Sequence, residues 1–396
     1  MKKYIFIIIL FLSIITVACV SNDGNGGSDE PIIVSEPTLT PEPTPMPSPE
    51  PPFAPDGDEK YTPDPTPEPF TSKEDEKHPQ PKFGFIDAHA DTPSRILTLD
   101  QFQRSLYENS DLHLDFKRLS EFEAAVQVFV AWCPGIYVDV AFEHTNLMFD
   151  VLEQEIEKHS DLIEIALDLN DVRRIANKGK ISAILAIEGG EALMGKIENL
   201  YHFYNRGVRI LAPTWNRENE LGFGHALNKT EGLKPFGIEC IKKMDELGMI
   251  IDVSHLNEAG FWDVHNIGTR PYMASHSNAY SILEHSRNLN DAQIMAIVER
   301  GGIIGFNMYK PFVSTKKTAT INDIMAHFKH WIDIGAGDHI GLGCDFDGID
   351  EMPEGITDVS SLKILAEELK KEFDEETSFK IMEGNFYDFF KRYFEG

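Results

Sequence analysis

Residues 83–91 read FGFIDAHAD, a short apolar run that ends in His89, Ala90 and Asp91. Further apolar runs follow along the chain, and most are separated by amphipathic stretches of helical period, such as 145–159 and 238–246. This alternation is typical of parallel strands whose faces are covered by helices. Eight such units fit a (β/α)₈ TIM-like barrel. We predict the strands at 83–88, 124–131, 182–187, 208–212, 249–253, 272–274, 302–306 and 340–343.

A doubly wound open sheet is the alternative architecture for the same alternation. A nucleotide-binding sheet of that kind carries a glycine-rich phosphate loop after its first strand. Residues 88–95 read AHADTPSR and hold no such loop. The barrel is therefore favoured, with one domain over residues 83–396.

Two segments of different character precede this domain. Residues 1–18 have two lysines followed by an apolar run, which is too short to span a bilayer at about 20 residues and is typical of a signal peptide. The end of the run, TVAC at 16–19, resembles a bacterial lipobox. We therefore expect Cys19 to be lipidated and to anchor a secreted protein at the surface of a bacterial membrane.

Residues 19–82 are rich in Pro, Glu and Thr. They contain 16 of the 23 prolines of the chain. Such a segment buries too little apolar surface to offset its loss of conformational entropy, and proline favours an extended backbone. We expect a disordered stalk that holds the folded domain away from the membrane.

The overall charge of the chain limits the kinds of molecule that we expect it to bind. The chain has 36 Lys and Arg against 65 Asp and Glu, a net charge of −29. Binding to nucleic acid requires clustered basic residues, so we expect no nucleic-acid partner. Only four cysteines are present, which argues against a disulfide scaffold. The oligomeric state stays open between monomer and homodimer.

Ionisable residues follow five of the predicted strands. In a barrel of this type, chemistry takes place where the strands end. Three histidines and three carboxylates gathered there would be costly to desolvate without a cation. One or two divalent ions, zinc or else Mn, Fe or Co, remove that cost, and a carboxylate can bridge two ions. The candidates are His89, Asp91, Glu188, His255, His276 and Asp345.

Several motifs resemble those of the membrane (renal) dipeptidase family of zinc metallopeptidases. They are HAD at 89–91, IEGG at 187–190, IDVSH at 251–255, SHSNAYS at 275–281 with HSRN at 285–288, and GCDFDG at 343–348. The resemblance covers residue 85 to about 394. It implies a TIM-like barrel of the metal-dependent hydrolase type, with a binuclear zinc site that hydrolyses the peptide bond of dipeptides through a metal-bridged hydroxide. It also implies tolerance of a D-residue at the C-terminal position.

The resemblance further implies a role for each candidate. His89 and Asp91 would bind one zinc ion, and His255 and His276 would bind the other. Glu188 would bridge the two ions.

The remaining catalytic roles follow from the same resemblance. Asp345 would accept the proton of the attacking water and pass it to the leaving amine. Arg287 would bind the substrate carboxylate, a role that suits the fork of a guanidinium. The partner is then a small peptide.

One position departs from the family pattern. The fourth strand of the family usually ends in Thr-His-Asn, whereas this chain has Trp215 in the place of the histidine. Tryptophan donates one hydrogen bond and carries no charge, and losing a polarising donor costs on the order of 10²–10³ in rate. Three consequences stay open: Asn216 or Arg217 compensates, the substrate differs, or activity is weak. We expect an active, divergent branch of the family in which Trp215 contacts the substrate.

Two alternative functions stay open. The first is another amidohydrolase with two metal ions, but such enzymes usually have His-x-His after the first strand and a modified lysine as the bridge. Here Asp91 and Glu188 occupy those places. The second is a weak or inactive solute-binding lipoprotein, against which the complete set of candidate ligands speaks.

Overall fold

The computed structural model describes residues 82–99, 105–227 and 230–395. The predicted signal peptide at 1–18, the lipidation site Cys19 and the predicted stalk up to residue 81 lie outside these residues. Within them, no helix combines the length and the apolar character needed to cross a bilayer.

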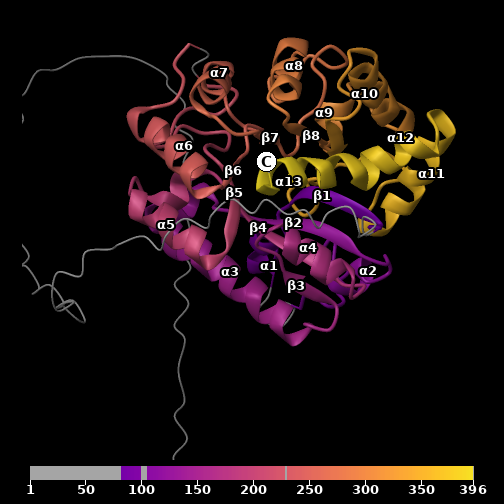
Figure 1. The fold of residues 1–396 in the computed structure, drawn as a ribbon, viewed down its shortest axis with the longest axis horizontal. Coiled ribbons are helices and arrows are strands. Elements are labelled where there is room, and N and C mark those ends of the chain that lie inside the picture. The colour runs from indigo at the N-terminus through magenta and orange to yellow at the C-terminus, as the bar shows by residue number, and fades with distance from the viewer. Residues whose placement is uncertain (1–81, 100–104, 228–229, 396) are drawn as a thin grey trace, which may run out of the picture. The chain divides into compact units, whose positions relative to one another are not determined.

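Eight parallel strands follow one another around a barrel (Figure 1). Each predicted strand is present, and the predicted fold is confirmed. The pairing runs in chain order from β1 to β9, and the seam between β6 and β7 is joined by a single parallel bridge, Asp252 to Met273. The barrel strands are β1 (Phe85–Ala90), β2 (Ala125–Trp132), β4 (Ile181–Glu188), β5 (Val208–Ala212), β6 (Ile250–Ile251), β7 (Met273–Ala274), β8 (Ile303–Phe306) and β9 (Ile340–Leu342).

A ninth strand, β3 (Ile163–Ile165), was not predicted. It pairs in parallel with the first three residues of β4, Ile181 to Ala183. The pairing of β5 with β4 begins only at Leu185, so β3 occupies the edge of β4 that β5 leaves open.

Helices cover the outside of the strands (Figure 1). Local sequence fixes several of their ends. The helix α6 starts at Pro235, and Gly248, whose φ is +70°, caps its C-terminal end. Capping boxes at Asn290 and Thr320 start α8 and α10. The helices are α1 (Thr92–Thr98), α2 (Phe116–Leu119), α3 (Ala141–Lys158), α4 (Leu169–Ala176), α5 (Ile197–Arg206), α6 (Pro235–Leu247), α7 (Glu258–Ile267), α8 (Asp291–Glu299), α9 (Lys310–Val313), α10 (Ile321–Asp333), α11 (Leu362–Glu372), α12 (Glu375–Phe379) and α13 (Asn385–Glu395).

The last helix, α13, closes one end of the barrel. Its buried aromatic side chains Phe386, Phe389 and Phe390 belong to a cluster with residues near the starts of the strands, such as Ile250 and Ile303. Burying each of these large side chains contributes about 1.5–3 kcal/mol. Because α13 covers the end where the strands begin, the opposite end is left for a functional site.

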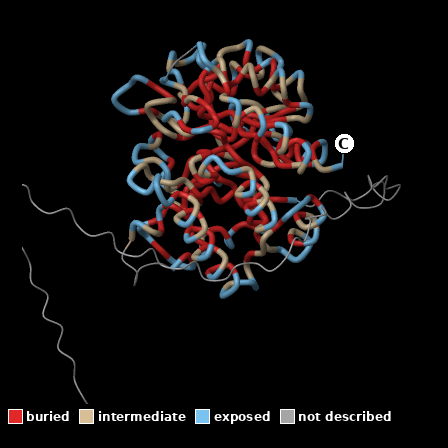
Figure 2. Tube along the Cα trace, turned by 90° about the vertical axis from the view of Figure 1, so that its left-hand side faces the viewer, coloured by how far each residue is buried: buried red, intermediate tan, exposed pale blue. Residues whose placement is uncertain are grey.

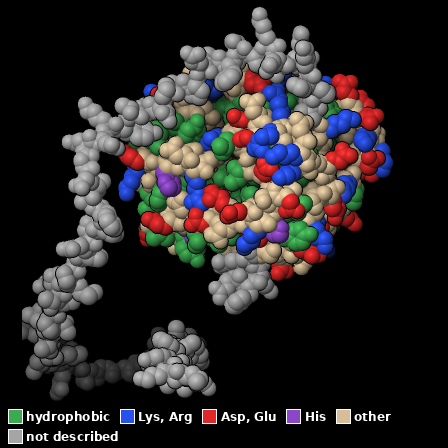
Figure 3. Space-filling view, turned by 60° about the horizontal axis from the view of Figure 1, so that its bottom comes forward, with side chains coloured by type: hydrophobic (Ala, Val, Ile, Leu, Met, Phe, Trp, Pro, Cys, Tyr) green, Lys and Arg blue, Asp and Glu red, His purple; other side chains and the backbone are tan. Residues whose placement is uncertain are grey.

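Buried residues concentrate in the interior, and exposed residues lie mainly on the outer helices and loops (Figure 2). On the face drawn in Figure 3, acidic and basic side chains are interspersed.

Candidate metal centre

A bulge in β1 positions the first two candidate residues. The pairing of β1 with β2 shifts between Asp87 and Ala90, and such a bulge redirects the side chains that follow it. His89 Nε2 lies 3.5 Å from Asp91 Oδ2. Both residues are buried, so they face each other inside the end of the barrel.

Glu188 is the last residue of β4, and two glycines follow it. Gly189 has a φ of +95°, which favours glycine, and its N–H donates to Ala212 O at 3.1 Å. A Cβ on Gly190 would lie 2.8 Å from Pro213 O. The glycine pair therefore lets the chain turn tightly against the end of β5 and leaves the Glu188 carboxylate inside the barrel.

Three histidines surround that carboxylate. Glu188 Oε1 lies 2.8 Å from His255 Nε2, 3.4 Å from His276 Nε2 and 3.8 Å from His89 Nε2. The Nε2 atoms of His255 and His276 are themselves only 2.8 Å apart. Side chains from β1, β4 and the ends of β6 and β7 therefore converge on one point.

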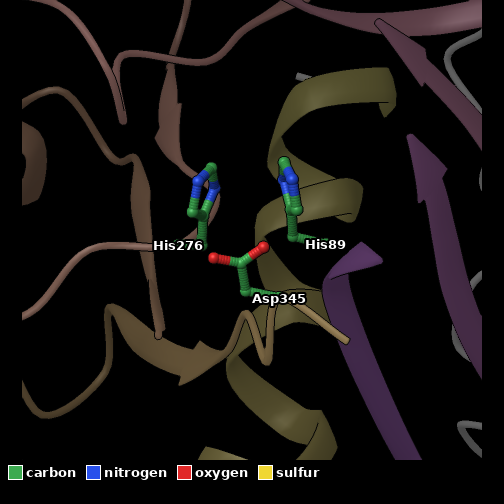
Figure 4. A group of neighbouring side chains, drawn as sticks. All are labelled: His89, His276 and Asp345. Atoms are coloured by element: carbon green, nitrogen blue, oxygen red, sulfur yellow. The ribbon is translucent and has the colours of Figure 1, made fainter. Parts of the chain in front are cut away.

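Asp345 completes the group from the loop after β9. Figure 4 shows its carboxylate between the rings of His89 and His276. Its backbone is left-handed, with a φ of +63°, and its N–H donates to His89 O at 3.0 Å. Asn307 Nδ2 donates to Asp345 Oδ2 at 3.0 Å and fixes the orientation of the carboxylate.

Asp252, at the end of β6, supports the histidines from behind. Its Oδ1 accepts from Ser254 Oγ at 2.7 Å, and its Oδ2 accepts from Ser275 Oγ at 2.5 Å. Ser275 Oγ in turn lies 2.7 Å from His276 Nδ1 and 3.1 Å from His89 Nδ1. One carboxylate thus orients two imidazoles so that their Nε2 atoms point into the group.

Asn216 supports the third imidazole. Its Oδ1 lies 2.9 Å from His255 Nδ1. An amide oxygen accepts only, so the proton sits on Nδ1 and Nε2 keeps its lone pair. This is the structural role of the residue next to Trp215.

Burial perturbs the charges of the group. Burial by itself lowers the pKa of His89, but Asp91 and Glu188 outweigh it and raise that pKa to about 10. Burial and the positive charge of Arg287 lower the pKa of His255 to about 4. Burial raises the pKa of Asp345 well above its usual value, opposed by His89 and reinforced by Asp91. The pKa values of neighbouring groups are thus shifted in opposite directions, raised for His89 and lowered for His255. A bound cation balances the charge of the carboxylates and relieves this conflict.

The residues fit divalent metal ions. His89 Nε2, Asp91 Oδ1 and Glu188 Oε1 are buried and make no hydrogen bond of proper geometry. Three sets have ligand atoms that lie within 4.8 Å of one another: His89, Asp91 and Glu188 form the first, Glu188, His255 and His276 the second, and His89, His276 and Asp345 the third. Imidazole and carboxylate are the donors that zinc and similar ions take. Glu188 belongs to the first and the second set, which is the position a bridging ligand needs.

The group opens into a cavity of about 270 Å³. Trp215 lines it, with its ring 4.8 Å from that of Trp132 and 6.3 Å from that of His255. Arg287, by contrast, is 2% exposed and is not among the lining residues. Its guanidinium donates to Ser254 O and, at 3.0 Å, to His276 O. Arg287 therefore lies against His255 and His276, with its Nη2 3.2 Å from His255 Nε2.

Four residues of the site were missed or not assigned a role in the sequence. Trp132 and Asn307 follow the second and seventh predicted strands, and the same rule that found the other candidates would have found them. Ser275 precedes His276, and no pattern marks a serine as a support for histidine. Asp252 stands three residues before His255, with a side chain whose direction depends on the end of β6.

We expect Asp252→Asn to weaken metal binding about 10- to 100-fold, the usual cost of losing an outer partner of metal-binding histidines. An amide in place of the carboxylate cannot accept from all the serine donors, so the orientation of His276 and His89 is lost. A chelator competition titration measures the affinity. Ser182→Ala, a buried serine on β4, serves as the control; equal affinities for Asp252→Asn and wild type would contradict the supporting role.

The comparisons with known proteins agree with this geometry. The family model described as membrane dipeptidase (peptidase family M19) matches residues 75–393. An uncharacterized protein from the pqqA 5′ region of Klebsiella pneumoniae is 33% identical over 247 residues, covering 60% of this chain and 89% of the relative. An uncharacterized dipeptidase of Schizosaccharomyces pombe is 30% identical over 299 residues, covering 69% and 71%.

Solved structures show the same architecture. A metallopeptidase of Rhodobacter sphaeroides, crystallised with a phosphinate mimic of the dipeptide L-Ala-D-Ala, is 26% identical with a TM-score of 0.73, covering 78% of this chain and 98% of that one. Dipeptidase AC, a metallopeptidase of family M19, is 27% identical with a TM-score of 0.74, covering 79% and 99%. A metallopeptidase fold, a matching family model and clusters of metal-binding side chains lead to one conclusion: the chain belongs to the membrane dipeptidase family, peptidase family M19, whose members use a divalent metal.

Proposed function

We propose that the protein is a dipeptidase that uses two zinc ions. The observation that carries the proposal is the position of Glu188, whose Oε1 lies within 3.8 Å of all three histidine Nε2 atoms. His89 and Asp91 would hold one ion, His255 and His276 the other, and Glu188 both. Two such ions polarise a peptide carbonyl and make a water molecule acidic near neutral pH.

Asp345 has the geometry of the group that moves the proton. Asn307 holds its Oδ2, so the carboxylate keeps a fixed direction between His89 and His276. It accepts a proton from the attacking water and donates it to the amine that leaves. Burial excludes bulk water from this transfer, because Asp345 is 8% exposed.

The size of the cavity and the relatives suggest the substrate. About 270 Å³ accommodates a small ligand. A dipeptide mimic with a C-terminal D-residue is bound by the Rhodobacter sphaeroides relative, and we extend tolerance of such a residue to this chain. Trp132 and Trp215 offer apolar surface to its side chains.

A panel of L,L- and L,D-dipeptides, assayed with the zinc-loaded full chain, tests the function. We expect hydrolysis of both classes and two zinc ions per chain by elemental analysis. Trp215→His tests the departure from the family and is expected to change rates within the panel. Two bound zinc ions with no hydrolysis of any dipeptide would contradict the proposal.

We further propose that Cys19 carries the lipid anchor that holds the enzyme at the surface of a bacterial membrane. The lipobox-like TVAC at 16–19 supports this, and two or more acyl chains give stable anchoring. In a bacterial host, Cys19→Ser is expected to move the protein from the membrane fraction to the soluble fraction. An unchanged distribution would contradict the anchor.

A further inference from the structure

The loop that carries Asp345 has a strained backbone. Three non-glycine residues of the described part of the chain have a left-handed φ, and two of them, Asp345 at +63° and Asp347 at +67°, stand two positions apart in residues 343–348, the Asp345 loop. Gly348 N–H donates to Asp345 O at 3.1 Å and closes a tight turn around both. A strained backbone persists only where its surroundings hold it, and such strain gathers at functional sites.

The barrel holds the first half of the Asp345 loop. Cys344 N–H donates to Asp87 Oδ1 on β1 at 2.7 Å. Phe346 O accepts from the N–H of Asp91, the residue that follows β1, at 2.8 Å. Both of these bonds lie before Asp347, so the second half of the loop depends on a different support.

His113 supplies that support from the segment between α1 and α2, 234 residues before Asp347. Its Nδ1 accepts from Asp347 N–H at 2.9 Å, and its own backbone N–H donates to Asp347 Oδ1 at 2.6 Å. Because a backbone N–H only donates, Nδ1 of His113 carries no proton. Thr92 Oγ1 donates to Asp347 Oδ2 at 2.6 Å. The backbone N–H and both carboxylate oxygens of Asp347 are therefore engaged.

The segment that carries His113 is itself fixed. His113 O accepts from Val359 N–H at 3.0 Å and from Arg118 Nη1 at 3.3 Å. Arg118 also forms ion pairs with Asp115 at 2.9 Å and with Asp358 at 3.4 Å. An outer partner that is held in this way can fix the position of the group it contacts.

We propose, on the basis of the dipeptidase function above, that His113 is a positioning residue, which holds Asp347 and thereby keeps the Asp345 carboxylate in place for proton transfer. A Cβ on Gly348 would collide with Asp345 Oδ1, so the end of the turn packs directly against that carboxylate. Misplacing a catalytic group by 1 Å costs about 10²-fold in rate. Because His113 is not among the residues that line the cavity, its loss is expected to affect kcat and to spare KM.

The test compares zinc-loaded full-length wild type with His113→Leu and His113→Asn on L-Ala-L-Ala. Leucine is branched at the same carbon but cannot accept, so Asp347 N–H loses its partner. We expect kcat of His113→Leu to fall about 10- to 100-fold, with KM within about threefold of wild type and zinc content unchanged. The amide oxygen of asparagine lies near the place of Nδ1 and accepts the same N–H. His113→Asn is therefore expected to keep kcat within about threefold.

His265→Leu is the matched control, because His265 is a half-buried histidine on α7 whose Nδ1 lies 2.9 Å from Tyr272 OH. Its kcat is expected to stay within about twofold of wild type. The proposal is overturned if His113→Leu keeps kcat within about threefold, if His113→Asn loses as much as His113→Leu, or if the loss comes with a loss of zinc.

A second variant covers the case in which His113→Leu does not fold. Thr92→Val has nearly the same shape and removes the hydrogen bond on the other side of Asp347. A lower kcat at unchanged zinc content supports the role of the Asp347 contacts, and a wild-type kcat overturns it.

Amide hydrogen exchange separates this proposal from the proposed function. Exchange is followed by mass spectrometry in peptides that cover the Asp345 loop, with all proteins loaded with zinc. If wild type hydrolyses no dipeptide, the proposed function fails, and the exchange still decides whether His113 holds the loop. Faster exchange in His113→Leu but not in His113→Asn supports that role, whereas equal exchange in all three proteins overturns it.

Discussion

Replacing Glu188 by alanine is expected to lower kcat/KM roughly 10³-fold or more and to reduce the zinc content below two ions per chain. Its carboxylate is the one group shared by the set that contains Asp91 and the set that contains His255. Removing it leaves each set with two donors, which is fewer than zinc sites in proteins use. A loss of about 4 kcal/mol of transition-state stabilisation corresponds to the predicted fall in rate.

The measurement combines steady-state kinetics with elemental analysis of the purified full chain. Glu191→Gln is a matched control, since Glu191 lies three residues further along and its Oε2 accepts from Asn219 instead of facing the histidines. Circular dichroism checks that the Glu188→Ala variant is folded. Wild-type activity in that variant would refute the assignment of the metal centre.

Asp345→Asn is expected to keep both metal ions and lose turnover by about 10²- to 10⁴-fold. The neutral amide has the shape of the carboxylate but cannot accept a proton, so general acid–base catalysis is removed. Asp345 also forms a candidate set with His89 and His276. Because the proposed function assigns it to neither ion, zinc content is expected to stay at the wild-type value. This separation of binding from turnover distinguishes Asp345 from Glu188.

Kinetics and zinc content are measured on the same preparation. Asp350→Asn, an exposed position in the same loop, is the control for the change of charge. A variant that turns over at the parent rate would exclude Asp345 from proton transfer, and one that loses its zinc would make Asp345 a ligand.

The order of the barrel strands was predictable because parallel strands are buried on both faces and therefore form continuous apolar runs. The strand β3 was not predictable, because a run of three residues is too short to show the apolar pattern of a strand. The bulge in β1 depends on its pairing with β2 and is invisible in the sequence of β1 alone.

The candidate ligands were predictable because their types follow the strand ends. The direction in which a long side chain points was not predictable. HSRN at 285–288 indicates an arginine near the site, and Arg287 lies against His255 and His276, but the atoms that its guanidinium contacts do not follow from the motif.

The closure of the barrel depends on the same residue that orients its histidines. Asp252 makes the lone bridge from β6 to β7, where Val253 N–H donates to Met273 O at 2.8 Å, while its carboxylate holds Ser254 and Ser275. Cofactor loss and loosening of this seam are then thermodynamically linked. Removing the ions with a chelator is expected to speed amide hydrogen exchange at Val253 before it does so in the long β2–β4 ladder. The metal-free protein then begins to unfold at the seam between β6 and β7, beside the metal-binding group.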